Sequence, residues 1–144
     1  MIEARQIAER LGGPEVLGTE ITSDLQFYRI MDQGLAPQVI DALIRNQVIS
    51  RQELNKLAIA PRTLARRKAQ HENLTAEESD RVIRIARIVA YAEEVFGDRA
   101  TAAGWLREAN RALDGQIPLE MVATETGARL VETVLDRLAF GDYS

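Results

Sequence analysis

The segment that most constrains the fold runs from Trp105 to Leu119, where Gly115 is followed three residues later by Pro118. Glycine adopts backbone angles that other residues avoid, and proline can open a helix but cannot continue one. The segment therefore predicts a compact bend between helices. The amphipathic run that follows has one apolar stripe, formed by Leu130, Val131, Val134, Leu135 and Leu138. We expect a small helical module in this part of the chain.

Composition limits the classes of protein that remain. The 144 residues are 46% hydrophobic, which is enough to form a core in one domain or in two small, closely packed ones. The absence of cysteine excludes disulfides and thiolate metal sites. The start of the chain lacks the pattern of a signal peptide, and the longest apolar run, 88–92, is too short to span a membrane. We expect a cytoplasmic protein that does not bind membranes.

The charge distribution is more informative than the net charge of -4. Residues 37–72 carry 7 basic and 3 acidic side chains, whereas the rest of the chain has an excess of acidic ones. One basic segment on an acidic protein predicts a local anionic partner.

The N-terminal part of the chain predicts supporting helices. Residues 3–11 should form a short helix that ends at Gly12 and Gly13, with a loop from Pro14 to Ile21. In the next helix, Leu25, Tyr28 and Met31 recur at three-residue spacing. Pro37 should open another helix with one apolar face, formed by Val39, Ile40, Leu43 and Ile44.

The sequence from Ser50 to Lys68 has the spacing of a helix-turn-helix motif. Ser50 and Glu53 form a capping box, in which each side chain bonds the other residue's free backbone amide at a helix start. A turn at 58–60 follows, and Pro61 then opens a second short helix in which Leu64 is the one large apolar residue. The second helix should therefore be basic and exposed.

This exposed helix favours binding to DNA. Arg62 and Arg66 lie one turn apart and can meet phosphates or base edges, but the sequence does not show which of them reads a base. The candidate DNA-binding residues are Arg51, Gln52, Arg62, Thr63, Arg66, Arg67 and Lys68. The alternative interpretation is a solvated basic helix on an ordinary helical bundle.

A second capping box, Thr75 with Glu78, should start the longest helix, which Gly97 ends. Outside pairs are expected between Glu77 and Arg81 and between Asp80 and Arg84. The domain division is then an N-terminal helix and loop (1–21), a helix-turn-helix domain (22–74), a connecting long helix (75–96) and a C-terminal module (97–144).

Residues suited to catalysis are scarce. His71 is the one histidine, and the sequence has no cysteine, no glycine-rich phosphate loop and no cluster of metal ligands. We expect no enzymatic activity, no cofactor and no metal site.

Several motifs in the expected order carry a resemblance to a known family. In the first half they are 63–67 (TLARR) and 74–81 (LTAEESDR). In the second half they are 92–98 (AEEVFGD), Trp105, Leu106, Asn110, Ala112, Leu113, Gly115, Pro118, Leu119, 124–131 (TETGARLV) and 141–144. With these motifs the chain resembles the Xre/ParS-type antitoxins of RES/Xre toxin-antitoxin systems. This chain has Ala109 where the family often has proline, and Asp114 where the family often has glycine. The geometry of this bend can therefore differ from that of the family.

The resemblance implies an all-α protein, with a helix-turn-helix DNA-binding headpiece packed on a small helical toxin-binding domain. It implies a homodimer that binds operator DNA of its own operon. It further implies a higher-order complex with a RES-domain toxin, an NAD-degrading enzyme whose active site the antitoxin blocks. The implied toxin-binding residues are Asn110, Arg111, Leu113, Gly115, Leu119, Arg129, Phe140, Gly141, Asp142, Tyr143 and Ser144. Two alternatives remain: a stand-alone helix-turn-helix transcriptional regulator without a toxin, and an interaction domain whose basic helix is incidental.

Overall fold

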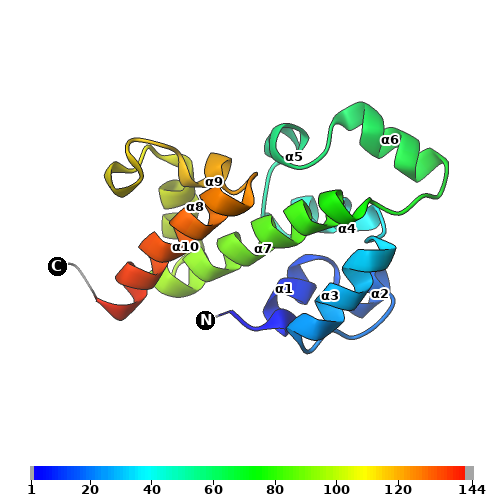
Figure 1. The fold of residues 1–144 in the computed structure, drawn as a ribbon, viewed down its shortest axis with the longest axis horizontal. Coiled ribbons are helices and arrows are strands. Elements are labelled where there is room, and N and C mark those ends of the chain that lie inside the picture. The colour runs from blue at the N-terminus through cyan, green and yellow to red at the C-terminus, as the bar shows by residue number, and fades with distance from the viewer. Residues whose placement is uncertain (1, 142–144) are drawn as a thin grey trace. The chain divides into compact units, whose positions relative to one another are not determined.

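The structure, a computed structural model, describes residues 2–141. These residues form helices and loops, with an isolated bridge between Asn110 and Gln116 and no strand in this range, which confirms the all-α prediction (Figure 1). The helices of the first half are α1 (Ala4–Arg10), α2 (Gly13–Leu17), α3 (Asp24–Gln33), α4 (Gln38–Arg45), α5 (Arg51–Leu57) and α6 (Pro61–Ala69). Those of the second half are α7 (Ala76–Phe96), α8 (Arg99–Arg107), the 3-10 helix η1 (Arg111–Leu113), α9 (Pro118–Met121) and α10 (Glu125–Phe140).

The chain divides into two compact units within α7. The first unit is Glu3–Ala86, and the second contains the residues from Arg87 onward. The boundary therefore falls inside the long helix, which the sequence predicts as a separate connecting segment (75–96). Within the described range, no helix is both long enough and apolar enough to cross a bilayer.

The core of the first unit comes from helices far apart in sequence. It includes Ile7, Ile40, Leu43, Leu54 and Ile83, which are almost completely buried. Polar residues define where these helices begin. At α3, the Ser23 hydroxyl accepts a hydrogen bond from the Gln26 amide and so caps the helix.

One expectation for the N-terminal region is wrong, and one apolar pattern does not mark a buried face. The expected loop contains α2, a five-residue helix with Pro14 in its first turn and a left-handed Gly18 at its end. In α3, Phe27 is the buried residue, whereas Leu25 and Tyr28 are exposed. The three-residue spacing therefore does not mark the buried face of this helix, because Phe27 is not one of the spaced residues and Met31 is only half-buried.

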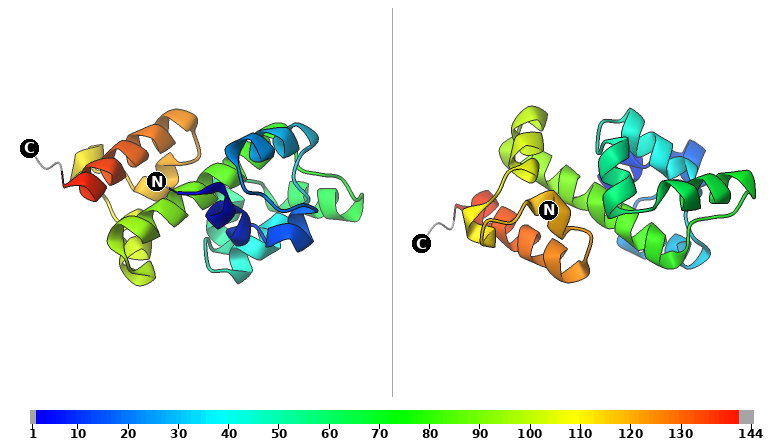
Figure 2. Two further views of the ribbon diagram at one scale, coloured as in Figure 1. Left: turned by 90° about the horizontal axis from the view of Figure 1, so that it is seen from below. Right: turned by 90° about the horizontal axis from the view of Figure 1, so that it is seen from above.

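The second unit is built on the later part of α7 and on α10. In Figures 1 and 2, α10 (orange to red) lies alongside the yellow-green end of α7, and the Tyr91 hydroxyl donates a hydrogen bond to Asp136 between them. The ring centroids of Trp105 and Phe96 lie 5.6 Å apart. Leu106, Leu119, Val131 and Leu135 form the core.

The final helix is capped at both ends, and two residues of its apolar stripe lie outside the buried core. Thr124 caps α10, since its hydroxyl accepts from the Gly127 amide, and Gly141 ends it with φ 67°. Val131, Val134 and Leu135 are buried, whereas Leu138 is half-buried and Leu130 is 49% exposed. Leu130 lies at the edge of the stripe and faces solvent.

Candidate functional site

The two helices of the helix-turn-helix motif form where the sequence predicts them. At the start of α5, the Ser50 hydroxyl accepts from the Glu53 amide (3.1 Å), and the Ser50 amide donates to the Glu53 carboxylate (3.0 Å). Pro61 is the first residue of α6. Leu54, Leu57 and Leu64 are buried, so one face of each helix is fixed against the core and the other is available.

The available face of the motif is basic. Arg62 and Arg66 of α6 are exposed, and neither side chain has an ion-pair partner within residues 2–141. Arg51 and Gln52 are exposed at the first turn of α5, and Thr63 is half-buried. The structure thus leaves two arginines, one helical turn apart, free to bind an anion.

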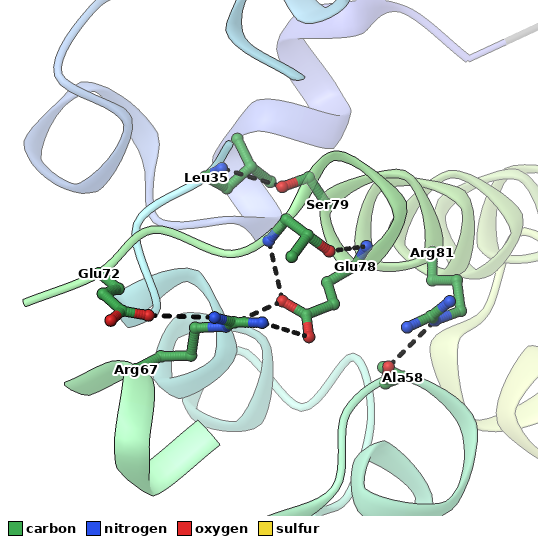
Figure 3. A network of polar contacts seen from close by, with 8 residues as sticks. Leu35, Ala58, Arg67, Glu72, Glu78, Ser79 and Arg81 are labelled. Atoms are coloured by element: carbon green, nitrogen blue, oxygen red, sulfur yellow. Dashed lines mark hydrogen bonds and ion pairs between the residues drawn. The ribbon is translucent and has the colours of Figure 1, made fainter. Parts of the chain in front are cut away.

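Arg67 and Lys68 lie differently, because both side chains contact carboxylates of the same unit; Figure 3 shows the contacts of Arg67. Arg67 donates to Glu78 through Nε and Nη2, each at 3.2 Å, and to Glu72 through Nη1 at 3.1 Å. Lys68 Nζ lies 2.9 Å from Asp41 of α4. Two of the seven candidate DNA-binding residues are therefore already engaged in holding α6 to its neighbours.

The electrostatics of the Arg67–Glu78 pair favour its charged form. Burial of the Glu78 carboxyl opposes ionisation, but the hydrogen bonds from Arg67 and Thr75 outweigh this cost, and the pKa of Glu78 is lowered. The pKa of Arg67 is raised, chiefly by its hydrogen bond to Glu78. Both shifts show that the folded structure stabilises the ion pair.

The first half of α7 contributes two further polar contacts. The Ser79 hydroxyl accepts from the Leu35 amide (2.9 Å), and Arg81 Nε donates to the Ala58 carbonyl in the α5–α6 turn (3.0 Å), as Figure 3 shows. The expected pair of Arg81 with Glu77 is therefore wrong, while the expected pair of Asp80 with Arg84 forms. No pattern in the sequence points Arg81 at a backbone carbonyl.

In the second unit, Asn110 closes the bend that the sequence analysis predicted. Its backbone amide donates to the Gln116 carbonyl (3.0 Å), its carbonyl accepts from Gly115 (2.8 Å), and its side-chain oxygen accepts from Ala112 (2.9 Å). Asp114 has φ 57° and Gly115 φ 80°, so both occupy the left-handed region. Asp114 is one of the two departures from the family pattern, and its backbone takes a conformation in which glycine is favoured.

The structure divides the expected toxin-binding residues into exposed and buried ones. Those exposed are Arg111, Gly115, Arg129, Phe140 and Gly141, and Asn110 is half-buried. Leu113 and Leu119 are only 7% and 2% exposed, so their side chains hold the bend and do not face a partner. Asp142, Tyr143 and Ser144 lie outside the described residues.

Exposed side chains on one face of α10 form a mixed apolar and basic surface. Phe140 is 81% exposed, and Leu130 also faces solvent. At helical spacing they share this face with Arg129 and Arg137, which are exposed as well. Arg129 is paired with Glu125 at 3.2 Å, and both side chains are largely in solvent, where such a pair contributes little. We name Arg129, Leu130, Arg137 and Phe140 the α10 face.

The described residues contain no group of histidine and acidic side chains that could hold a metal ion. His71 is exposed, in a left-handed turn after α6. The surfaces that stand out are instead suited to binding macromolecules. Their geometry defines a helical protein of the helix-turn-helix class with a second helical unit that presents an apolar and basic face.

Comparisons with known proteins place the chain more narrowly. Residues 28–87 match the antitoxin Xre-like helix-turn-helix domain, and residues 92–141 match the antitoxin Xre/MbcA/ParS C-terminal toxin-binding domain. A protein of Pseudomonas putida named antitoxin Xre is 34% identical over 122 residues, covering 85% of this chain and 76% of the relative. Antitoxin Xre of Yersinia enterocolitica is 29% identical, covering 99% and 93%. That of Photorhabdus laumondii is 26% identical, covering 99% and 94%.

The chain belongs to the Xre/ParS-type antitoxin family. It combines a helix-turn-helix domain of the kind that binds DNA with a C-terminal domain of the kind that binds a toxin.

Proposed function

We propose that this protein neutralises a RES-domain, NAD-degrading toxin by covering its active site, and that it binds the operator of its own operon as a repressor. One observation carries the proposal: a single chain joins a helix-turn-helix unit with two unpaired arginines to a toxin-binding domain with an exposed apolar and basic face. Its activity is binding, and the enzymatic step belongs to the toxin. We assign it to the cytoplasm.

The α10 face is the proposed contact with the toxin. Phe140 and Leu130 expose apolar area that association would bury, and aromatic residues are frequent anchors at protein interfaces. Arg129 and Arg137 add positive charge beside them. We further assign 141–144, together with Arg111 and Gly115 of the bend, to this interface.

On the DNA side, Arg62 and Arg66 are the proposed contacts of α6, supported by Arg51, Gln52 and Thr63. Operators of helix-turn-helix proteins are commonly read by dimers, whose two reading helices reach successive major grooves. We therefore propose that the protein acts as a homodimer and forms a higher-order complex with the toxin. The helix-turn-helix domain (22–74) is thus the proposed DNA-binding part, and the C-terminal module (97–144) is the proposed toxin-binding part.

The test is to co-express the chain with the protein encoded beside it, and to measure complex formation and NAD hydrolysis. A stable complex without NAD-degrading activity supports the proposal. Independent migration of the two proteins, with DNA binding retained, would instead show a stand-alone transcriptional regulator.

A crossed pair of variants separates the two activities. Arg62→Ala with Arg66→Ala should weaken binding to the DNA upstream of the gene and spare neutralisation. Phe140→Ala with Leu130→Ala should do the reverse. Each pair serves as the control for the other, and loss of both activities in both pairs would contradict the assignment of separate surfaces.

A further inference from the structure

The first turns of α7 carry three side chains that bond three different parts of the helix-turn-helix unit (Figure 3). Glu78 holds Arg67 of α6. Ser79 bonds the backbone of Leu35 before α4, and Arg81 bonds the Ala58 carbonyl in the turn that joins α5 to α6. None of the three lies on α6 itself. Glu78 bonds a side chain of that helix directly, and Arg81 bonds the turn before it.

Glu78 is the most constrained of the three. Its residue is 8% exposed, and one carboxylate oxygen accepts from the Thr75 amide (2.8 Å) and from Arg67 Nε (3.2 Å). The other oxygen accepts from Arg67 Nη2 (3.2 Å). Two parallel bonds between a carboxylate and a guanidinium fix their relative orientation as well as their distance. The Thr75 bond ties this carboxylate to the start of α7.

Arg67 is correspondingly unavailable to a ligand in this conformation. Its side chain is 14% exposed, and Glu72 takes a third hydrogen bond, from Nη1. Contact with a DNA phosphate would require it to leave two carboxylates. The second tie on α6, Lys68 with Asp41, is between side chains that are 34% and 41% exposed, and exposed pairs constrain little.

Two neighbouring arginines on α6 point in different directions, and the contacts of Arg67 therefore affect how the helix is oriented. Arg66 points to solvent, and Arg67, the next residue, is fixed to α7. Successive residues on a helix differ in direction by about 100°, so holding Arg67 fixes the rotation of α6 about its axis. That rotation decides where Arg62 and Arg66 point.

We propose that Glu78 is a positioning residue for DNA binding, which acts through Arg67 to set the direction of Arg62 and Arg66. The inference rests on the proposed binding of DNA by α6. It distinguishes two classes of arginine in this helix: Arg62 and Arg66 contact the nucleic acid, and Arg67 orients the helix that carries them.

The test compares Glu78→Gln with Glu77→Gln, its exposed neighbour on α7. Both substitutions remove one negative charge, which by itself favours binding to DNA. Glu77→Gln should therefore leave affinity unchanged or slightly raised. Glu78→Gln places an amide against Arg67 and should lower affinity by about tenfold, because misaligning an arginine against a base edge costs roughly 5- to 150-fold without removing a phosphate contact. The probe is the DNA upstream of the gene, and the full chain is used.

The salt dependence of binding separates positioning from contact. Each phosphate contact contributes about 0.9 to the slope of log affinity against log salt. Arg62→Ala should reduce this slope, whereas Glu78→Gln and Arg67→Lys should lower affinity with the slope unchanged. Arg67→Lys keeps the charge but cannot make the paired bonds, so it gives the same test if Glu78→Gln does not fold. Circular dichroism and toxin neutralisation report whether the fold is intact.

The outcomes are distinct. Lower affinity with an unchanged slope in a folded variant supports the positioning role. Affinity equal to that of Glu77→Gln, or a slope reduced by Arg67→Lys, overturns it while leaving DNA binding in place. If the wild-type protein does not bind its upstream DNA at all, both this inference and the proposed repressor function are overturned.

Discussion

Two glycines in the second unit should respond to the same substitution with opposite signs. A Cβ atom built on Gly127, near the start of α10, would lie 2.0 Å from the Met121 carbonyl oxygen and 2.9 Å from the Thr124 hydroxyl. Real Cβ atoms essentially never approach within 3.0 Å, so the backbone at Met121 must move. On Gly104 of α8, the nearest atom to an added Cβ is a Glu108 carboxylate oxygen at 4.0 Å.

The magnitudes follow from these distances. Replacing glycine by alanine within a helix stabilises a protein by roughly 0.5–1 kcal/mol. At Gly104 nothing opposes this gain. At Gly127 the gain is opposed by overpacking, which costs about 1–3 kcal/mol, and by disturbance of the Thr124 cap, worth about 1 kcal/mol. Gly127→Ala should therefore destabilise the unit by about 1–3 kcal/mol, and Gly104→Ala should stabilise it.

Urea unfolding followed by circular dichroism measures both effects. Trp105 fluorescence gives a second reading for Gly127→Ala, because Trp105 is in the same unit and is not adjacent to the substitution. Equal or increased stability of Gly127→Ala would refute the close packing of α9 against the start of α10.

Three further outcomes are expected. Ser79→Ala leaves the buried Leu35 amide without its acceptor, and urea unfolding should show a loss of about 1–3 kcal/mol, against little change for the exposed Thr133→Ala. The pKa of Glu78 in the folded protein lies below its ordinary value of 4.5. The ionised carboxylate therefore stabilises the fold above pH 4.5, and this stabilisation is lost as the pH falls through the folded pKa. Acidification should thus lower the stability of the wild type more than that of Glu78→Gln. Phe140→Ala should weaken the toxin complex by at least about tenfold, as expected for an aromatic anchor, with unfolding unchanged, and full affinity would exclude Phe140 from the interface.

Local chemistry was enough to predict most helix boundaries. Ser50 with Glu53 and Thr124 with Gly127 are caps formed by residues three apart, and such contacts can be read directly from the sequence. The bend at Gly115 could also be predicted, because the spacing of Gly115 and Pro118 is a local signal. Pro118, which opens α9, is likewise a local signal.

Contacts between distant residues were beyond the reach of the sequence. Ser79 and Leu35 are 44 residues apart, and Arg67 and Glu78 are 11 apart on different helices. The same limitation explains the exposed Leu130, because the edge of an apolar stripe is defined only by what packs against it. At α2, the glycines and Pro14 resemble a loop, since a five-residue helix depends on its tertiary surroundings.

The central claim is that one chain carries separate surfaces for DNA and for a toxin. Binding to the toxin can be measured directly. The proposed RES-domain toxin, purified with measurable NAD hydrolysis, is titrated with this protein. The account predicts that hydrolysis falls to background at a fixed molar ratio, and that Phe140→Ala with Leu130→Ala shifts the curve to higher concentration. Undiminished NAD hydrolysis in the presence of excess wild-type protein would contradict it.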